Sequence, residues 1–120
     1  MVNKRSGNYA KNLIVVIKGI KGGKGLRRNS PVNYRCFINV SGWPNIDEVD
    51  IWFLKPPNDE IKHVNIFPPR DCPYLGRRLP YLCYGNLNTK LEGHETLLFF
   101  LGGLKTVLNN QNFSSPARSY

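Results

Sequence analysis

The sequence contains no run of eighteen or more apolar residues, so a membrane-spanning helix of the usual kind is not expected. Its first residues, from Met1 to Gly7, are polar and basic and lack the apolar stretch that a secretory signal peptide needs. We therefore expect a soluble, cytoplasmic protein that is not exported and has no membrane partner.

Cysteine is scarce, since the chain has only Cys36, Cys72 and Cys83. An odd number of cysteines without a C-x-x-C spacing indicates neither a disulfide framework nor a zinc site, so no metal site is predicted. Reduced thiols, as in a cytosol, are the expectation.

Acidic residues are also few: eight Asp and Glu stand against seventeen Lys and Arg, which gives a formal net charge of +9. Such a surface attracts nucleic acid, an anionic membrane or an acidic protein face, and the charge alone does not choose among them. The basic residues cluster at residues 18–28 and 70–78. Neither cluster alternates with aromatic residues as a single-strand stacking platform would, so solvated loops are an equal alternative.

The 120 residues, with 41% hydrophobic content, fit one globular domain at residues 12–117 after a basic flexible tail at residues 1–11. Short apolar or alternating runs bounded by glycine and proline predict four strands. The expected strands are residues 12–17, 34–40, 49–54 and 61–67. The first is apolar and β-branched, which predicts burial on both faces. From Pro68 to Pro80 we expect an irregular surface excursion.

Two glycine-containing segments are candidates for special roles. Gly19 to Gly25 contains lysines, but no Gly-Lys-Ser/Thr leads into a helix, so a flexible hairpin connection is favoured over a phosphate-binding loop. Gly102-Gly103 lies inside the predicted helix, and a close approach of helix to sheet would explain this pair.

The longest helical pattern opens at Thr96 and ends at Asn109-Asn110. Its apolar residues recur at three- and four-residue intervals, which predicts one face packed on the sheet. These residues are Leu97, Phe100, Leu101, Leu104, Val107 and Leu108. Strands followed by one helix predict an α+β fold, an antiparallel meander of about four strands with one long helix packed on one face.

The three cysteines differ in their surroundings. Cys36 lies in an alternating strand and is expected to be a buried apolar residue. Cys72 is expected to be an exposed thiol in a polar loop. Cys83 follows Arg77 and Arg78 and precedes His94, and nearby cations favour the nucleophilic thiolate. A buried structural role remains the alternative for Cys83.

The segment that begins at Cys83 continues through a polar loop to Thr96, a leucine-rich helix and Ser114-Ser115-Pro116-Ala117. In this order and spacing it resembles the core of ubiquitin-conjugating enzymes, in particular the compact prokaryotic type. Residues 34–40, the turn at Trp43-Pro44 and residues 49–53 are similar to that family's third strand, proline turn and fourth strand. The resemblance implies a minimal core that lacks the family's first and last helices.

The resemblance implies that Cys83 accepts the carboxyl terminus of a ubiquitin-like modifier, or of another protein, as a thioester. An activating (adenylating) enzyme would supply the thioester, and a lysine amine of a target protein would receive the acyl group. No cofactor is implied, and antiphage conjugation is the context that the compact relatives suggest.

His63-Val64-Asn65 is the nearest likeness to the family's His-Pro-Asn motif, with Val in place of Pro. It implies that Asn65 stabilises the oxyanion, while His94 would accept the lysine's proton. Cys72 lies nearer to this motif and is the competing nucleophile. A non-catalytic member of the same fold that binds a modifier or partner, and a small basic nucleic-acid-binding domain, remain alternatives.

Overall fold

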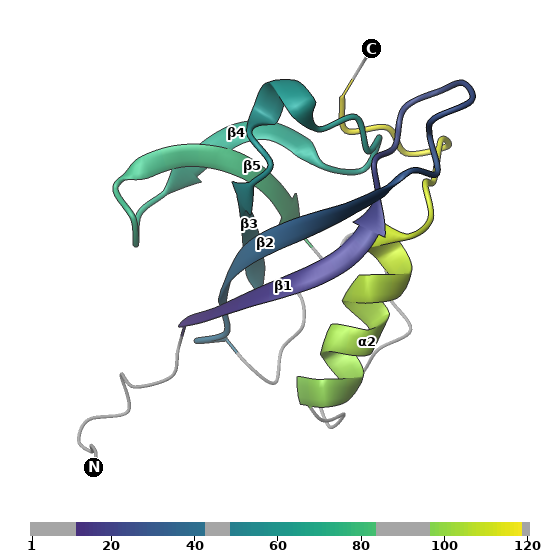
Figure 1. The fold of residues 1–120 in the computed structure, drawn as a ribbon. Helices are drawn as coiled ribbons and strands as arrows, with labels where there is room; N and C mark the ends of the chain where they lie inside the picture. Colours follow the sequence, from purple (N-terminus) through teal and green to yellow (C-terminus); the bar gives the residue numbers. More distant parts are fainter. Residues whose placement is uncertain (1–11, 43–48, 84–96, 119–120) are drawn as a thin grey trace, which may run out of the picture.

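The computed structural model describes residues 12–42, 49–83 and 97–118 (Figure 1). It has five strands, a short 3-10 turn and one helix. They are β1 (Asn12–Ile20), β2 (Pro31–Asn39), β3 (Asp50–Lys55), the 3-10 turn Asn58–Glu60, β4 (Phe67–Cys72), β5 (Arg77–Cys83) and α2 (Leu97–Leu108). The predicted α+β class is confirmed, with five strands in place of about four.

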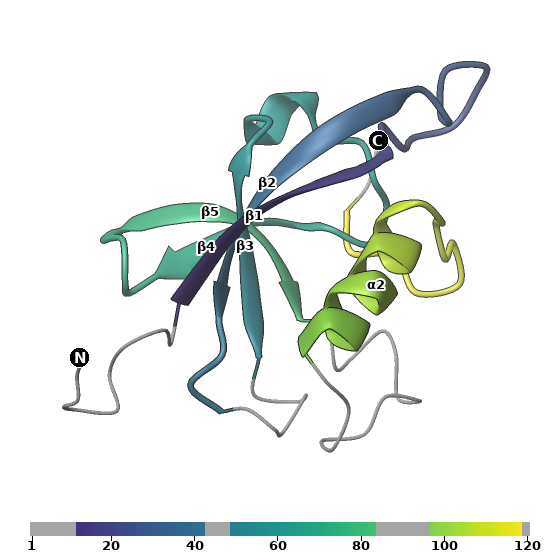
Figure 2. The same ribbon diagram turned by 60° about the horizontal axis from the view of Figure 1, so that its bottom comes forward.

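All neighbouring strands of the sheet are antiparallel, in the order β1-β2-β3-β5-β4. β5 therefore lies between β3 and β4, so the sheet departs from the simple meander that we expected. The strands fan out strongly about the sheet centre, and α2 lies on one side of them (Figure 2). Right-handed strand twist accumulated over five strands produces this shape.

The strand predicted at residues 61–67 is wrong, and so is the irregular excursion after it. Residues 61–66 form turns and one isolated bridge, and the strand begins at Phe67. β4 tolerates Pro68 and Pro69 because it is an edge strand whose register shifts between Phe67 and Arg70. Proline lacks a backbone N–H, and an edge bulge is where a sheet does not need one.

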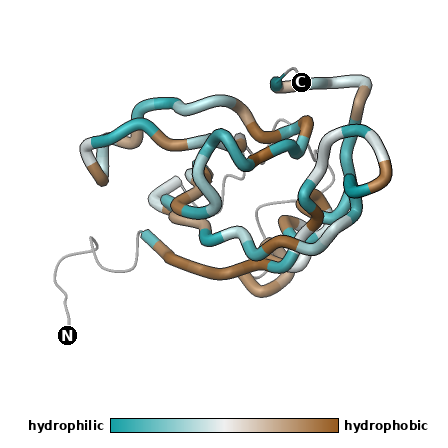
Figure 3. Tube along the Cα trace, turned by 45° about the horizontal axis from the view of Figure 1, so that its top comes forward, coloured by the Kyte–Doolittle hydropathy of each residue, from teal (hydrophilic) through white to brown (hydrophobic). Residues whose placement is uncertain are grey.

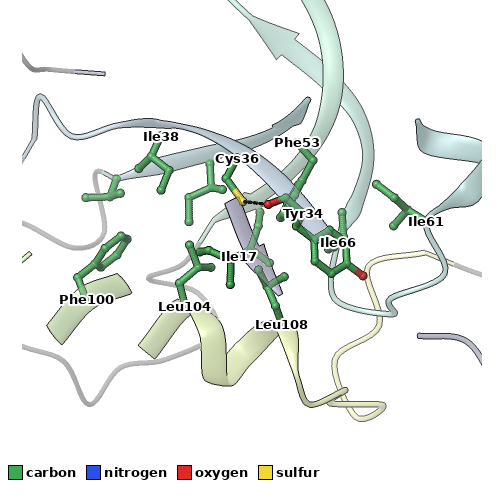
Figure 4. Packing of buried hydrophobic residues seen from close by; sticks show 13 residues of the cluster. Ile17, Tyr34, Cys36, Ile38, Phe53, Ile61, Ile66, Phe100, Leu104 and Leu108 are labelled. Carbon is green, nitrogen blue, oxygen red and sulfur yellow. Dashed lines mark hydrogen bonds between the residues drawn. The ribbon is translucent and has the colours of Figure 1, made fainter. Parts of the chain in front are cut away.

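The helix side of the sheet holds the main core, with Phe100, Leu104 and Leu108 of α2 fully buried against it (Figure 4). The predicted stripe is confirmed as the core contact, with Leu101 and Val107 partly buried, except for Leu97, which is 36% exposed. Cys36 is fully buried here, as predicted, and its Sγ donates to the carbonyl oxygen of Tyr34.

The close approach of helix to sheet occurs at Gly19 and not at Gly102. A Cβ on Gly19 would lie 2.7 Å from the carbonyl oxygen of Leu108, so only glycine fits there. A Cβ on Gly102 would meet nothing within 4 Å. The close approach that we expected to explain the glycine pair therefore does not involve Gly102.

The opposite side of the sheet carries an apolar row that crosses all five strands. In register order the row is Ile14, Phe37, Trp52, Tyr81 and Phe67. Tyr74, at the tip of the β4–β5 hairpin, contacts the rings of Phe37 and Trp52. Cys72 belongs to this second cluster and is 1% exposed, so the predicted exposed thiol is wrong.

β1 is an edge strand, and its predicted burial on both faces is wrong. Ile14 and Val16 are 55% and 63% exposed, while Ile17 faces the core. Figure 3 shows apolar residues along most of this strand at the border of the molecule. A run of β-branched residues predicts a strand, but it does not say whether neighbours cover the strand.

Candidate functional site

Cys83 is the last residue of β5, where the chain leaves the sheet. Its register partner across the ladder is Asp50, the first residue of β3. The phenol of Tyr81 donates a hydrogen bond to the Asp50 carboxylate. Cys83 therefore ends a regular strand, with an acidic residue as its neighbour.

The segment that carries Asn65 approaches the end of β5 through one cross-strand pair. Phe67 is the register partner of Tyr81. Asn65 lies two residues before Phe67, and Cys83 lies two residues after Tyr81. Because the strands are antiparallel, both residues lie beyond the same end of the β4–β5 ladder. The two segments implied by the resemblance therefore leave the β4–β5 ladder at the same end.

The side-chain amide of Asn65 is fully hydrogen-bonded and 2% exposed. Its Nδ2 donates to the carbonyl oxygens of Asn112 (2.9 Å) and Ser115 (3.1 Å), and its Oδ1 accepts from the Asn112 N–H (2.7 Å). Both protons of the amide are thus used to hold the chain after α2. This arrangement leaves no donor of Asn65 for a reacting oxyanion.

His63 is fully buried beside Asn65 and is held in one tautomer. Its Nδ1 accepts the backbone N–H of Asn65 (3.2 Å), so Nε2 carries the proton and donates to the carbonyl oxygen of Val107 (3.1 Å). Burial lowers the pKa of His63 to about 4 from its ordinary 6.5, against the opposing effect of the backbone carbonyls. The imidazole is therefore neutral at physiological pH.

Acidification is expected to destabilise the protein through His63. Between pH 6.5 and 4 the unfolded state binds a proton at this histidine and the folded state does not, so stability falls as pH falls. The loss approaches about 3 kcal/mol near pH 4. Urea unfolding from pH 7 to 4 measures it. The slope should persist in His94→Gln and flatten in His63→Gln, and an unchanged slope in His63→Gln would contradict the assignment.

Gln111 and Arg118 tie the chain after α2 to the rest of the molecule. Gln111 accepts the backbone N–H groups of Gly23 and Val64 at its Oε1 and donates its Nε2 to the Gly23 carbonyl. Arg118 donates to the backbone carbonyls of Asn58, Ile61 and Ile66 before β4 and to that of Phe67, the first residue of β4. We call His63, Asn65, Gln111 and Arg118 the tail clasp.

Sequence reasoning missed the tail clasp, because Gln111 and Arg118 follow the helix in a polar stretch without periodicity. The signal available was a run of amide side chains, Asn109 to Asn112, directly after an apolar helix. Such side chains bind backbone groups wherever the chain is irregular.

The cations expected to activate Cys83 begin the strand that Cys83 ends. Arg78 lies five residues before Cys83 in β5, about 17 Å in an extended strand, which exceeds the roughly 8 Å screening length at physiological salt. The Arg78 side chain instead donates to the carbonyl of Pro69 and pairs with Asp71 at 3.6 Å on the surface. The lowering of the Cys83 pKa by Arg77 and Arg78 stays a prediction, because the Cys83 side chain lies outside what the structure describes.

Of the three cysteines, Cys36 and Cys72 are too deeply buried to react with a macromolecular partner. Cys36 is fully buried, and burial raises the pKa of its thiol to about 12. Cys72 is 1% exposed. The candidate proton acceptor His94 and the helix start at Thr96 lie outside the residues that the structure describes.

Within the described ranges, histidine, cysteine and carboxylate side chains form no group that could hold a metal ion. No helix in the same ranges has the length and apolar character needed to cross a membrane. Comparison with known proteins finds no matching protein family, no similar curated protein and no similar solved structure.

Proposed function

We propose that the protein is a ubiquitin-conjugating-enzyme-like carrier that holds a modifier, or another protein's carboxyl terminus, as a thioester on Cys83. The observation that carries the proposal is the burial of the other two thiols. Cys36 and Cys72 are 0% and 1% exposed. Cys83 is therefore the proposed attachment point for a protein-sized acyl group. It ends β5, where the chain leaves the sheet.

The chemistry consists of two acyl transfers. The Cys83 thiolate attacks the thioester on the activating enzyme, a new C–S bond forms at Cys83, and the enzyme's thiolate leaves. A lysine amine then attacks the Cys83 thioester, so that an amide bond forms, the C–S bond breaks and the amine loses its proton. His94 is the proposed acceptor of that proton.

The hydrogen bonds of the Asn65 side chain support a positioning role for this residue. Because its amide protons hold the chain after α2, Asn65 would position that chain and its own segment without donating to the reacting atoms. Asp50, the register partner of Cys83, is a carboxylate that sequence reasoning did not single out. It is a second candidate acceptor for the amine's proton.

Trapping tests the proposal. Incubation with an activating enzyme, its modifier and ATP should give a carrier adduct that a thiol reductant removes. The adduct should disappear in Cys83→Ala and persist in Cys72→Ala, because Cys72 is buried. Cys83→Ser should convert it into a reductant-resistant oxyester. An adduct that survives Cys83→Ala unchanged would overturn the assignment.

Nucleic-acid binding is a second candidate, favoured by one observation that the sequence did not suggest. The guanidinium of Arg70 lies over the rings of Phe67 (4.4 Å) and Tyr81 (5.8 Å), which places a cation among aromatics. With a net charge of +9, phosphate contacts would give an affinity that falls steeply with salt. Retention of DNA or RNA at low salt, lost in Arg70→Ala, would favour this function over the carrier.

A further inference from the structure

The first part of the β1 edge, through Val16, is apolar and uncovered by the described chain, whereas the carbonyl of Lys18 is bound by Asn109. β1 has nine residues and pairs only with β2 within the described part of the sheet. Ile14 and Val16, on the side away from the helix, are 55% and 63% exposed. Proteins usually shorten, charge or cover such an edge, because its backbone groups are ready to pair with another strand.

The register shows which backbone groups of β1 face outward. Lys21 donates its N–H to the carbonyl of Ser30 (2.7 Å), so the odd-numbered residues of β1 bond β2 and the even-numbered ones face away. The side chain of Asn109 confirms this, because it donates to the outward carbonyl of Lys18 (3.0 Å). The outward backbone groups of Ile14 and Val16 have no partner among the described residues.

A groove of about 470 Å³ runs between this strand and α2. It is lined by Val15, Val16, Ile17, Lys18, Leu98, Leu101, Gly102 and Lys105. Leu98 is 79% exposed, and an added Cβ at Gly102 would meet nothing within 4 Å, so the helix side of the groove is open. A strand added to β1 would place alternate side chains in this groove and the others beside Ile14.

The positive charge of the groove favours an acidic ligand. Lys18 and Lys105 line it, and its lining includes no acidic residue. A second copy of this chain would bring another net charge of +9 to the same place, which opposes self-association. We propose that the β1 edge and the β1–α2 groove bind an extended acidic and apolar segment of a partner protein as an added β-strand.

Peptides of about eight residues, long enough to span most of β1, test the inference. The probes alternate Glu or Asp with Val, Ile, Leu or Phe and carry a fluorescent label for anisotropy. We expect saturable binding with shifts of the Ile14 and Val16 amide signals in NMR spectra. The same peptides with Lys in place of the acidic residues should not bind, and neither should peptides N-methylated at alternate amides.

Val16→Pro is the sharpest protein variant. The Val16 N–H faces away from β2, so proline there removes no β1–β2 hydrogen bond but eliminates a donor that an added strand needs. Affinity should fall at least about tenfold. The N-methylated peptides make the same test without changing the protein, so the inference stays testable if the proline variant is unstable.

Charge variants distinguish binding in the groove from nonspecific attraction to the basic surface. Lys18→Glu and Lys105→Glu should each weaken binding about fivefold at low salt, since a rim charge contributes about 1 kcal/mol. Lys24→Glu makes the same change of net charge outside the groove, on the exposed loop between β1 and β2, and should change affinity less than about twofold.

Three outcomes would overturn the inference. They are no binding of the acidic peptides at millimolar concentration, equal binding of the N-methylated peptides, and a β1-dependent dimer of the protein alone in sedimentation. The inference does not rest on the carrier function, because the peptide experiments use the protein without thioester chemistry.

Discussion

Replacing Asn65 by Ala is expected to lower the free energy of unfolding by about 3 kcal/mol, measured by urea denaturation. The amide of Asn65 makes three hydrogen bonds to backbone groups of Asn112 and Ser115, and it is 2% exposed. Each bond contributes about 1 kcal/mol net, and the backbone groups that lose a buried partner must find water. The variant should therefore release the chain after α2.

Asn110→Ala is the matched control. Its Nδ2 donates to the carbonyl of Thr106 (2.8 Å) within the last turn of α2, on the exposed side, so its loss should cost below about 1 kcal/mol. Wild-type stability of Asn65→Ala would contradict the positioning role and reopen an oxyanion role. Any acyl-transfer assay of Asn65→Ala must accordingly be normalised to the folded fraction.

Replacing Gly22 by Ala is expected to cost about 4 kcal/mol or more, the largest effect that we predict for a single methyl group. Gly22 has φ of +84°, a backbone conformation that L side chains rarely adopt. An added Cβ would also overlap the backbone N and Cα of His63 and lie 2.7 Å from the carbonyl carbon of Lys62. Because these atoms are backbone, they cannot move aside as a side chain can.

Gly25→Ala separates the two costs. Gly25 also has positive φ, +106°, but a Cβ there would meet nothing within 4 Å. Its replacement should cost only the conformational part, about 1–2 kcal/mol. Urea unfolding of both variants gives the steric part as their difference. Equal losses at the two positions would contradict the tight contact between the β1–β2 loop and His63.

The sequence predicted the α+β class, the helix and its buried face, because these depend on composition and on a 3.6-residue period. It misplaced the fourth strand because Ile61 to Ile66 contains enough apolar and β-branched residues for one. The tail clasp explains why residues 61–66 form no strand, since Arg118 and Gln111 bind backbone groups that a neighbouring strand would have paired. Those partners come from about fifty residues away and have no local signal.

The order of the strands in the sheet could not be predicted from the sequence either. β1 and β3 are both apolar runs, yet Trp52 of β3 is 4% exposed whereas Ile14 of β1, on the same side of the sheet, is 55% exposed. Only the position of each strand in the sheet explains the difference, because β3 lies between two neighbours and β1 has one.

The candidate site could be predicted from the sequence only where local information was enough. The position of Cys83 after an apolar run is local information, and it correctly indicated the end of a core segment. The sequence did not indicate that Arg77 and Arg78 share a regular strand with Cys83, and an extended strand separates residues that are close in sequence. The engagement of both protons of the Asn65 amide depends on residues 112 and 115, which no motif near Asn65 could indicate.

The tail clasp also sets an order of events during synthesis. Ser115 follows Asn65 by fifty residues, which a ribosome takes about 3–10 s to add. Throughout that interval the carbonyls of Ile61, Ile66 and Phe67 lack the guanidinium of Arg118, their partner in the finished fold. The segment before β4 therefore cannot gain these hydrogen bonds until residue 118 has been added.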